Sequence, residues 1–138
     1  MSYFEVIAQY GKVNEDGKPA NIKETYLVQS ETFTQAETII TDNLKGYTDL
    51  HVNAIKRSKI EEIIDRTSST ETAYYLAKFD IPMIDEITGK TLHKRLSILI
   101  SANDSKDAHK QAEEFTASYL SDIEITNIDK SRIIGILK

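Results

Sequence analysis

Hydrophobic and polar residues alternate along several stretches of the chain, as they do in half-buried β-strands. Residues 3–13 and 22–29 are rich in β-branched and aromatic side chains, and this pattern predicts two strands. Residues 14–17 lie between them and contain a glycine, which favours the tight turn of a hairpin. The same pattern returns later in the chain and predicts strands over 73–83 and 91–101, joined by a turn at 85–90.

Apolar residues at helical spacing follow each hairpin. They predict a helix over 34–44, begun by a capping box in which Thr34 is the N-cap and Glu37 reaches back. They also predict a second helix from about residue 105 to 120. After each helix a third strand is expected, over 50–58 and 123–130.

The two halves of the sequence resemble each other. Residues 49–64 align with residues 122–137 at a constant offset, and the aspartate, the serine and three isoleucines match identically. Upstream the offset is one residue smaller, as a loop insertion would leave it. The pattern therefore indicates an internal duplication.

The expected fold class is α+β, with two β-β-α-β repeats that form antiparallel sheet with the helices packed on one face. The first repeat covers residues 1–64 and the second covers 73–138, with a polar linker at 65–72. Because one hairpin with one helix cannot bury its apolar face alone, we expect the two repeats to form one compact domain.

Some apolar residues alternate out of step with those that face the helices, so on a strand their side chains would point to the other face of the sheet. They are Ile7, Leu27, Ile55, Leu76, Leu99 and Ile128. A sheet face in contact with water should be polar, so these residues indicate that the second face is also covered. Packing within one monomer, association with a second copy, and a covered ligand groove all remain open explanations.

Composition excludes several kinds of chemistry. The 138 residues carry a net charge of −5, which argues against a broad basic surface for duplex nucleic acid. Cysteine is absent, so disulfides and thiolate sites are excluded. The five glycines are isolated and form no phosphate-binding loop, and the three histidines lack metal-ligand spacing. We expect no catalytic residues, no metal, no cofactor and no enzymatic activity.

The N-terminal residues do not form a signal peptide, and no apolar run has the length of a membrane span. We therefore expect a soluble, cytoplasmic protein with no membrane partner.

Three motifs resemble those of a known family. Residues 24–28 (ETYLV) and 32–37 (TFTQAE) are similar to its "E-x-Y-L-V … x-F-T-E-A-E" signature, and residues 54–57 (AIKR) are similar to its "D-I-K-R". The family is uncharacterised, is catalogued as domain of unknown function 4494, and occurs in gut Bacteroidetes and their phages. In the second half, residues 104–106 (DSK) depart from the aromatic-Thr pattern. The resemblance implies a phage or mobile-element protein, a setting in which replication accessories are common, and carries over no catalytic residue.

Basic residues at strand ends are the only repeated chemical feature. Lys56, Arg57 and Lys59 run along the end of the third strand, Lys130 and Arg132 are their copies, and Lys94 and Arg95 lie on the fifth strand. Tyr3 and Tyr74 are strand tyrosines that could stack on bases. The same residues are also ordinary at sheet edges, where charge prevents unwanted strand pairing.

The leading hypothesis is a non-enzymatic accessory protein, oligomeric and of phage type, that binds single-stranded nucleic acid through these nine residues. The alternative is a protein-interaction or assembly module that docks a partner, or itself, through the second, apolar sheet face. Paired basic clusters that converge in space would favour the first hypothesis, whereas an obligate oligomer indifferent to nucleic acid would favour the second.

Overall fold

The computed structural model describes residues 2–13, 15–65, 73–118 and 122–138. The described chain forms two compact units, which are treated separately below. Unit 1 consists of residues 1–59 with 132–138, and unit 2 consists of residues 60–131. These boundaries differ from the expected division at residues 65–72, and residues 66–72 of that segment lie outside the described residues.

Unit 1 is a four-stranded sheet with one helix. Its strands have the order β3-β1-β2-β8. The elements are β1 (Ser2–Val13), β2 (Pro19–Ser30), α1 (Phe33–Leu44), β3 (Thr48–Arg57) and β8 (Ile133–Leu137). Both hairpin strands extend further than the sequence predicted, by one to three residues at an end.

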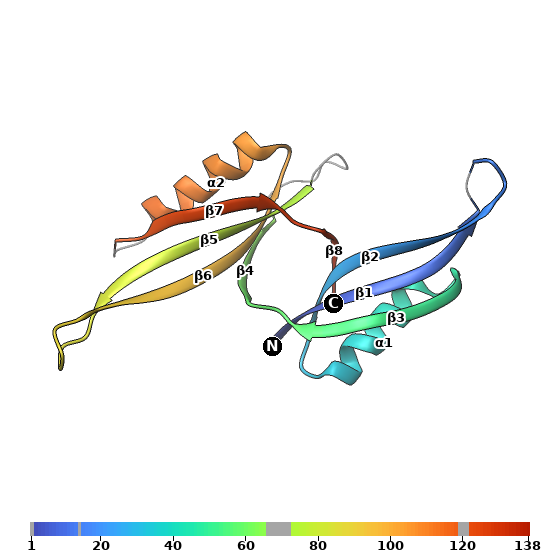
Figure 1. The fold of residues 1–138 in the computed structure, drawn as a ribbon, viewed down its shortest axis with the longest axis horizontal. Coiled ribbons are helices and arrows are strands. Elements are labelled where there is room, and N and C mark those ends of the chain that lie inside the picture. The colour runs from blue at the N-terminus through green and yellow to red at the C-terminus, as the bar shows by residue number, and fades with distance from the viewer. Residues whose placement is uncertain (1, 14, 66–72, 119–121) are drawn as a thin grey trace. The chain divides into compact units, whose positions relative to one another are not determined.

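Unit 2 has the same plan. Its strands have the order β4-β6-β5-β7 (Figure 1). The elements are β4 (Ile60–Asp65), β5 (Ala73–Ile84), β6 (Thr91–Ala102), α2 (Ser105–Ala117) and β7 (Glu124–Lys130).

The fold is mixed α+β, with strands predominating, as expected, but each sheet is mixed rather than antiparallel. Three strands of each sheet pair antiparallel, whereas β8 pairs parallel to β2 and β4 pairs parallel to β6. Sequence reasoning missed both of these short strands. Each fourth strand also belongs to the sheet of the other half of the sequence. Along the chain β4 follows β3 of unit 1, but it lies in unit 2. In the same way β8 follows β7 of unit 2, but it lies in unit 1.

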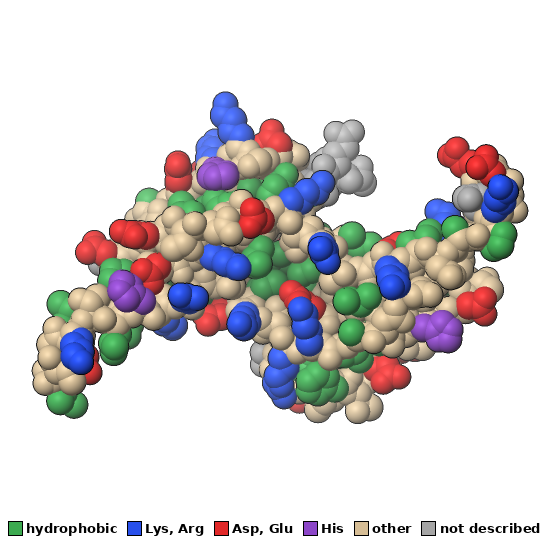
Figure 2. Space-filling view, in the orientation of Figure 1, with side chains coloured by type: hydrophobic (Ala, Val, Ile, Leu, Met, Phe, Trp, Pro, Cys, Tyr) green, Lys and Arg blue, Asp and Glu red, His purple; other side chains and the backbone are tan. Residues whose placement is uncertain are grey.

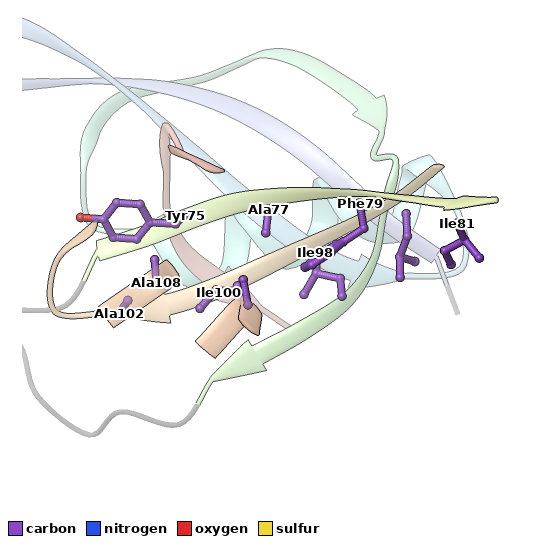
Figure 3. Close-up of a cluster of buried hydrophobic side chains, with 10 residues drawn as sticks. Tyr75, Ala77, Phe79, Ile81, Ile98, Ile100, Ala102 and Ala108 are labelled. Carbon is purple, nitrogen blue, oxygen red and sulfur yellow. The ribbon is translucent and has the colours of Figure 1, made fainter. Parts of the chain in front are cut away.

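Each helix covers one face of its sheet. In unit 1 the helix residues Ala36, Ile40 and Leu44 pack with Phe4 and Val28 of the sheet. In unit 2, Ala108 and Ala112 of α2 pack on a cluster from β5 and β6 (Figure 3). That cluster contains Tyr75, Ala77, Phe79, Ile81, Leu96, Ile98, Ile100 and Ala102. The alternation of strand side chains places these residues on one face.

The N-cap of the first helix lies two residues earlier than the sequence suggested, and the helix itself begins one residue earlier. The side chain of Thr32 is the N-cap and accepts a hydrogen bond from the backbone N–H of Gln35 at 3.1 Å. Gln35 in turn accepts from the backbone N–H of Glu31 at 3.1 Å. The predicted capping pair, Thr34 and Glu37, is thus replaced by Thr32 and Gln35, in an arrangement that differs from a capping box because Gln35 accepts from the residue before the N-cap.

Of the six residues assigned to the second sheet face, Ile7 and Leu76 are partly buried, and the other four fall into two groups. Leu27 and Leu99 are fully buried in the single chain, so their burial requires no second copy. Ile55 and Ile128 instead pack in the helix-side clusters. Register shifts in the pairing of β3 with β1, and of β7 with β5, change the parity of these two isoleucines.

Candidate functional site

One end of unit 1 brings a cation and an exposed aromatic ring together. The Arg57 guanidinium lies 5.4 Å from the Phe4 ring centroid and 5.5 Å from that of Phe33. The two rings meet edge to face, with centroids 4.8 Å apart. Phe4 is buried, whereas Phe33 is 45% exposed. We call Arg57, Phe33 and Phe4 the Arg57 platform.

The secondary structure explains why these three residues meet. Phe4 lies near the start of β1, and its backbone is opposite Arg57 near the end of β3. Phe33 is the first residue of α1, which begins at this end of the sheet because Thr32 caps it there. A guanidinium within about 6 Å of a ring centroid is attracted by the negative face of the ring. Sequence reasoning selected Arg57 but missed Phe33, although the aromatic residue just before the predicted helix was visible in the TFT segment.

The other predicted residues of unit 1 do not join the platform. Tyr3 is adjacent to Phe4 on β1 and therefore points to the opposite face of the sheet. Lys56 lies on that opposite face, where its ammonium is 3.2 Å from a Glu5 carboxylate oxygen. Lys59 is exposed in the connector after β3.

Arg132 lies at the far edge of the sheet. It directly precedes β8, whereas Arg57 ends β3 on the opposite edge. Three strand spacings separate these edges, a distance of about 14 Å. Unit 1 therefore does not merge its basic residues into one groove.

In unit 2 the predicted residues are also spread along the sheet. Lys130 pairs with Tyr75 near one end of β5, whereas Arg95 pairs with Asp80 and Lys94 with Ile81 near the other. Five residues of β5 separate the two levels, which corresponds to about 17 Å.

Tyr74 lies beside the Lys130 end of unit 2. Burial, followed by the negative charge of Asp65, raises its pKa. Its phenol therefore stays protonated at neutral pH, where it can donate a hydrogen bond but does not act as a base.

A groove of about 470 Å³ lies at the same end of unit 1 as the platform. It is lined by Gln29, Ser30, Glu31, Thr34, Gln35, Thr38 and Ile39. Among the described lining residues only Glu31 is ionisable, and a carboxylate would repel phosphate. The groove is therefore suited to uncharged polar groups, and the Arg57 platform remains the better candidate for an anion.

A polar cluster in unit 1 was not anticipated from the sequence. The hydroxyls of Tyr10 and Tyr26 both donate hydrogen bonds to the Glu24 carboxylate, the latter at 2.5 Å. The Tyr47 ring packs on Tyr10 with centroids 4.1 Å apart. The hydrogen bond to Glu24, followed by burial, raises the pKa of Tyr10 to about 12. Burial and then the same carboxylate also raise the pKa of Tyr26. The phenols of Tyr10 and Tyr26 therefore remain neutral at physiological pH, and neither acts there as a base or a nucleophile.

The β5–β6 hairpin of unit 2 exposes large hydrophobic side chains (Figure 2). Met83, Ile84 and Leu92 are 47%, 75% and 50% exposed. Ile87 in the turn is 94% exposed. A side-chain hydrogen bond closes the turn: the Asp85 carboxylate accepts from the Ile87 N–H at 2.9 Å, which lowers the Asp85 pKa. Exposed apolar groups on an ordered turn are typical of contact surfaces.

The described residues contain no group of three or more His, Asp or Glu side chains arranged to hold a metal ion. Among the helices of the described chain, neither combines the length and the apolar character that crossing a bilayer would demand.

Comparison with known proteins places the chain in a family. A family model described as Domain of unknown function (DUF4494) matches residues 2–138. No curated protein and no solved structure matches the chain. Since the match extends over nearly the whole sequence, the chain belongs to the DUF4494 family.

Proposed function

We propose that the protein is a non-enzymatic accessory protein, of phage or mobile-element type, that binds single-stranded nucleic acid at the Arg57 platform of unit 1. The observation that carries this proposal is the exposed Phe33 ring beside the Arg57 guanidinium. A base can stack on an exposed aromatic ring while a guanidinium pairs with the adjacent phosphate. The host cell's cytoplasm is the proposed compartment.

The proposed site is smaller than the track expected from the sequence. Lys56 is partly neutralised by Glu5, and Lys94, Arg95, Lys130 and Arg132 do not lie together within either unit. The net charge of −5 further limits long-range attraction of phosphates. We therefore propose a contact of one or two nucleotides at the platform rather than a continuous backbone groove.

Fluorescence anisotropy of a labelled single-stranded oligonucleotide at low salt tests this proposal. We expect saturable binding that weakens as salt is added, because phosphate contacts release counterions. Phe33→Leu keeps the apolar bulk against Phe4 but removes the stacking surface, and should weaken binding by about 5- to 150-fold, the equivalent of 1–3 kcal/mol per stacked base. Arg57→Gln should also weaken binding.

Arg95→Gln is the matched control, since Arg95 is an exposed arginine on a strand of unit 2. Its affinity should equal that of the wild type. Absence of saturable binding at tens of micromolar protein, or equal losses in all three variants, would remove the basis of the proposal.

A protein-interaction module is the second candidate, and the exposed β5–β6 hairpin favours it. Leu27 and Leu99 are already buried in the single chain, so such a module would use Met83, Ile84, Ile87 and Leu92 rather than the second sheet face. Light scattering discriminates between the candidates. Reversible association that oligonucleotide does not affect, and that an Ile87→Asp substitution abolishes, would favour the interaction module.

We also propose that the two halves arose by duplication of one β-β-α-β-β element. Two observations support this: the element order occurs twice along the chain, and the two sheets have corresponding strand orders. The residue matches between 49–64 and 122–137 fall on corresponding strands.

A further inference from the structure

The connectors before β4 and β8 are very short. Because of this, β4 cannot pair in the sheet that contains β3, and β8 cannot pair in the sheet that contains β7. Only Ser58 and Lys59 join β3 to β4, and only Ser131 and Arg132 join β7 to β8. In unit 1 the fourth strand is parallel to β2, and β3 has the same direction as β2 because both are antiparallel to β1. A connection between parallel strands of one sheet needs a crossover of about a dozen residues or more. Each strand must therefore enter another sheet.

A tight hairpin is also disfavoured at both connectors. The two-residue turns that join antiparallel strands prefer Asn-Gly or a similar pair with positive φ, and neither connector contains glycine or asparagine. The backbone N–H of Ser58 donates to the Tyr3 carbonyl, and that of Ser131 to the Tyr74 carbonyl, each at 2.8 Å. These bonds extend the antiparallel pairing of β3 with β1 and of β7 with β5 by one residue. The chain therefore continues in the direction of the strand and does not turn back on itself.

β8, which leaves the sheet of unit 2, is complementary to the edge of β2 in unit 1. β8 pairs with residues Thr25–Val28 of β2 and buries Ile133 to 4% exposure. Gly135 permits a close approach to Tyr26, because a Cβ on Gly135 would lie 3.4 Å from carbons of the Tyr26 ring. Four residue pairs join β8 to β2. A short edge strand of this kind can open at a lower free energy than the whole unit.

From these observations we propose that two copies of the chain form a dimer by exchanging β8, so that Ile133–Leu137 of each copy pairs with β2 of the other. The exchanged dimer forms the same strand contacts as the monomer and requires no new complementary surface. Short connectors that cannot fold back favour such exchange. The acceptor edge within the same chain competes at a high effective concentration, so the dimer should form when the protein is unfolded and refolded at high concentration. This inference is independent of nucleic-acid binding.

Engineered cysteines test the exchange, since the natural sequence contains none. Gln29 and Lys138 each lie one residue beyond the last pair, Val28 with Leu137. Gln29→Cys and Lys138→Cys are made as separate single variants, unfolded together, refolded at roughly millimolar concentration and treated with a short bismaleimide. We expect a covalent heterodimer, together with dimers in light scattering whose fraction rises with the refolding concentration.

Two controls make the result specific. Glu86→Cys in the β5–β6 turn replaces Lys138→Cys in a matched mixture and should give several-fold less heterodimer. The Ile87→Asp substitution should not change the yield, which separates strand exchange from association through the exposed hairpin. A heterodimer yield no higher than in the Glu86→Cys mixture would overturn the proposal. A protein that scatters as a monomer after refolding at every concentration would do so as well.

Discussion

Equivalent positions in the two units carry different chemistry. Tyr10, Glu24 and Tyr26 of unit 1 form a hydrogen-bonded group on the helix-side face. By the pairing registers of the two hairpins, Ile81, Leu96 and Ile98 take these places in unit 2, where all three are buried. An equivalent position on a central strand can thus be filled either by an apolar side chain or by a polar one whose hydrogen bonds are satisfied.

The tyrosine cluster predicts a pH dependence of stability at high pH. An unfolded tyrosine loses its proton near pH 10, whereas the pKa of Tyr10 in the folded protein is about 12. Between these values the unfolded state binds fewer protons than the folded state, so the free energy of unfolding should fall as pH rises. Urea unfolding of the wild type and of Tyr10→Phe between pH 9 and pH 12 measures this fall.

Tyr10→Phe should be less stable than the wild type at pH 9 because it lacks the hydrogen bond to Glu24. Its stability should then decline less steeply above pH 10, because phenylalanine does not titrate. Parallel pH profiles for the two proteins would contradict a raised pKa at Tyr10.

At the residue scale, sequence reasoning found part of the candidate site. Arg57 was visible as a basic residue at a strand end, because charge and position are local properties. Phe33 was missed because its contact with Arg57 depends on where α1 begins relative to β3. Tyr3 and Lys56 were grouped with Arg57, but strand alternation places them on the other face.

The elements that the sequence missed are the two short edge strands. The six residues of β4 and five of β8 contain too few alternations to stand out from a disordered end. The exposed fraction of the side chains in β8 nevertheless alternates as in a strand, since Ile133 is 4% exposed and the adjacent Ile134 is 53% exposed. Successive side chains on a strand point to opposite faces.

This adjacent pair of isoleucines provides a matched test of β8. Ile133→Ala should lower the free energy of unfolding by about 2–5 kcal/mol, the usual cost of truncating a buried isoleucine. Ile134→Ala makes the same change one residue away and should stay within about 0.5 kcal/mol of the wild type, because its side chain is mostly in solvent. Urea denaturation followed by circular dichroism measures both. Equal losses would show that β8 does not alternate as described.

At the scale of the whole molecule, β4 and β8 couple the two halves of the sequence, because each pairs in the sheet of the other half. Ile60 belongs to the first half, yet β4 pairs with β6 of unit 2. Its side chain is 5% exposed. A substitution in one half of the sequence should therefore destabilise the sheet built by the other half.

Ile60→Ala tests this coupling. It should increase hydrogen exchange at the amides of β5 and β6, because it weakens the strand that covers the edge of β6. Glu61→Ala is the control, since Glu61 is exposed on the same strand. Hydrogen exchange measured by mass spectrometry reports the peptides of each strand. Faster exchange confined to residues 2–59 would be incompatible with the pairing of β4 and β6.

The sequence by itself determined the α+β class, both hairpins and both helices, because alternation, turn residues and helical spacing act between near neighbours along the chain. Only the tertiary structure decided which sheet receives β4 and β8, that their pairing is parallel, and which face each basic residue occupies. These outcomes depend on partners more than 30 residues away, on two-residue connectors and on register shifts. A local sequence pattern does not depend on such distant partners, so it could not predict that each half of the sequence gives one strand to the other half's sheet.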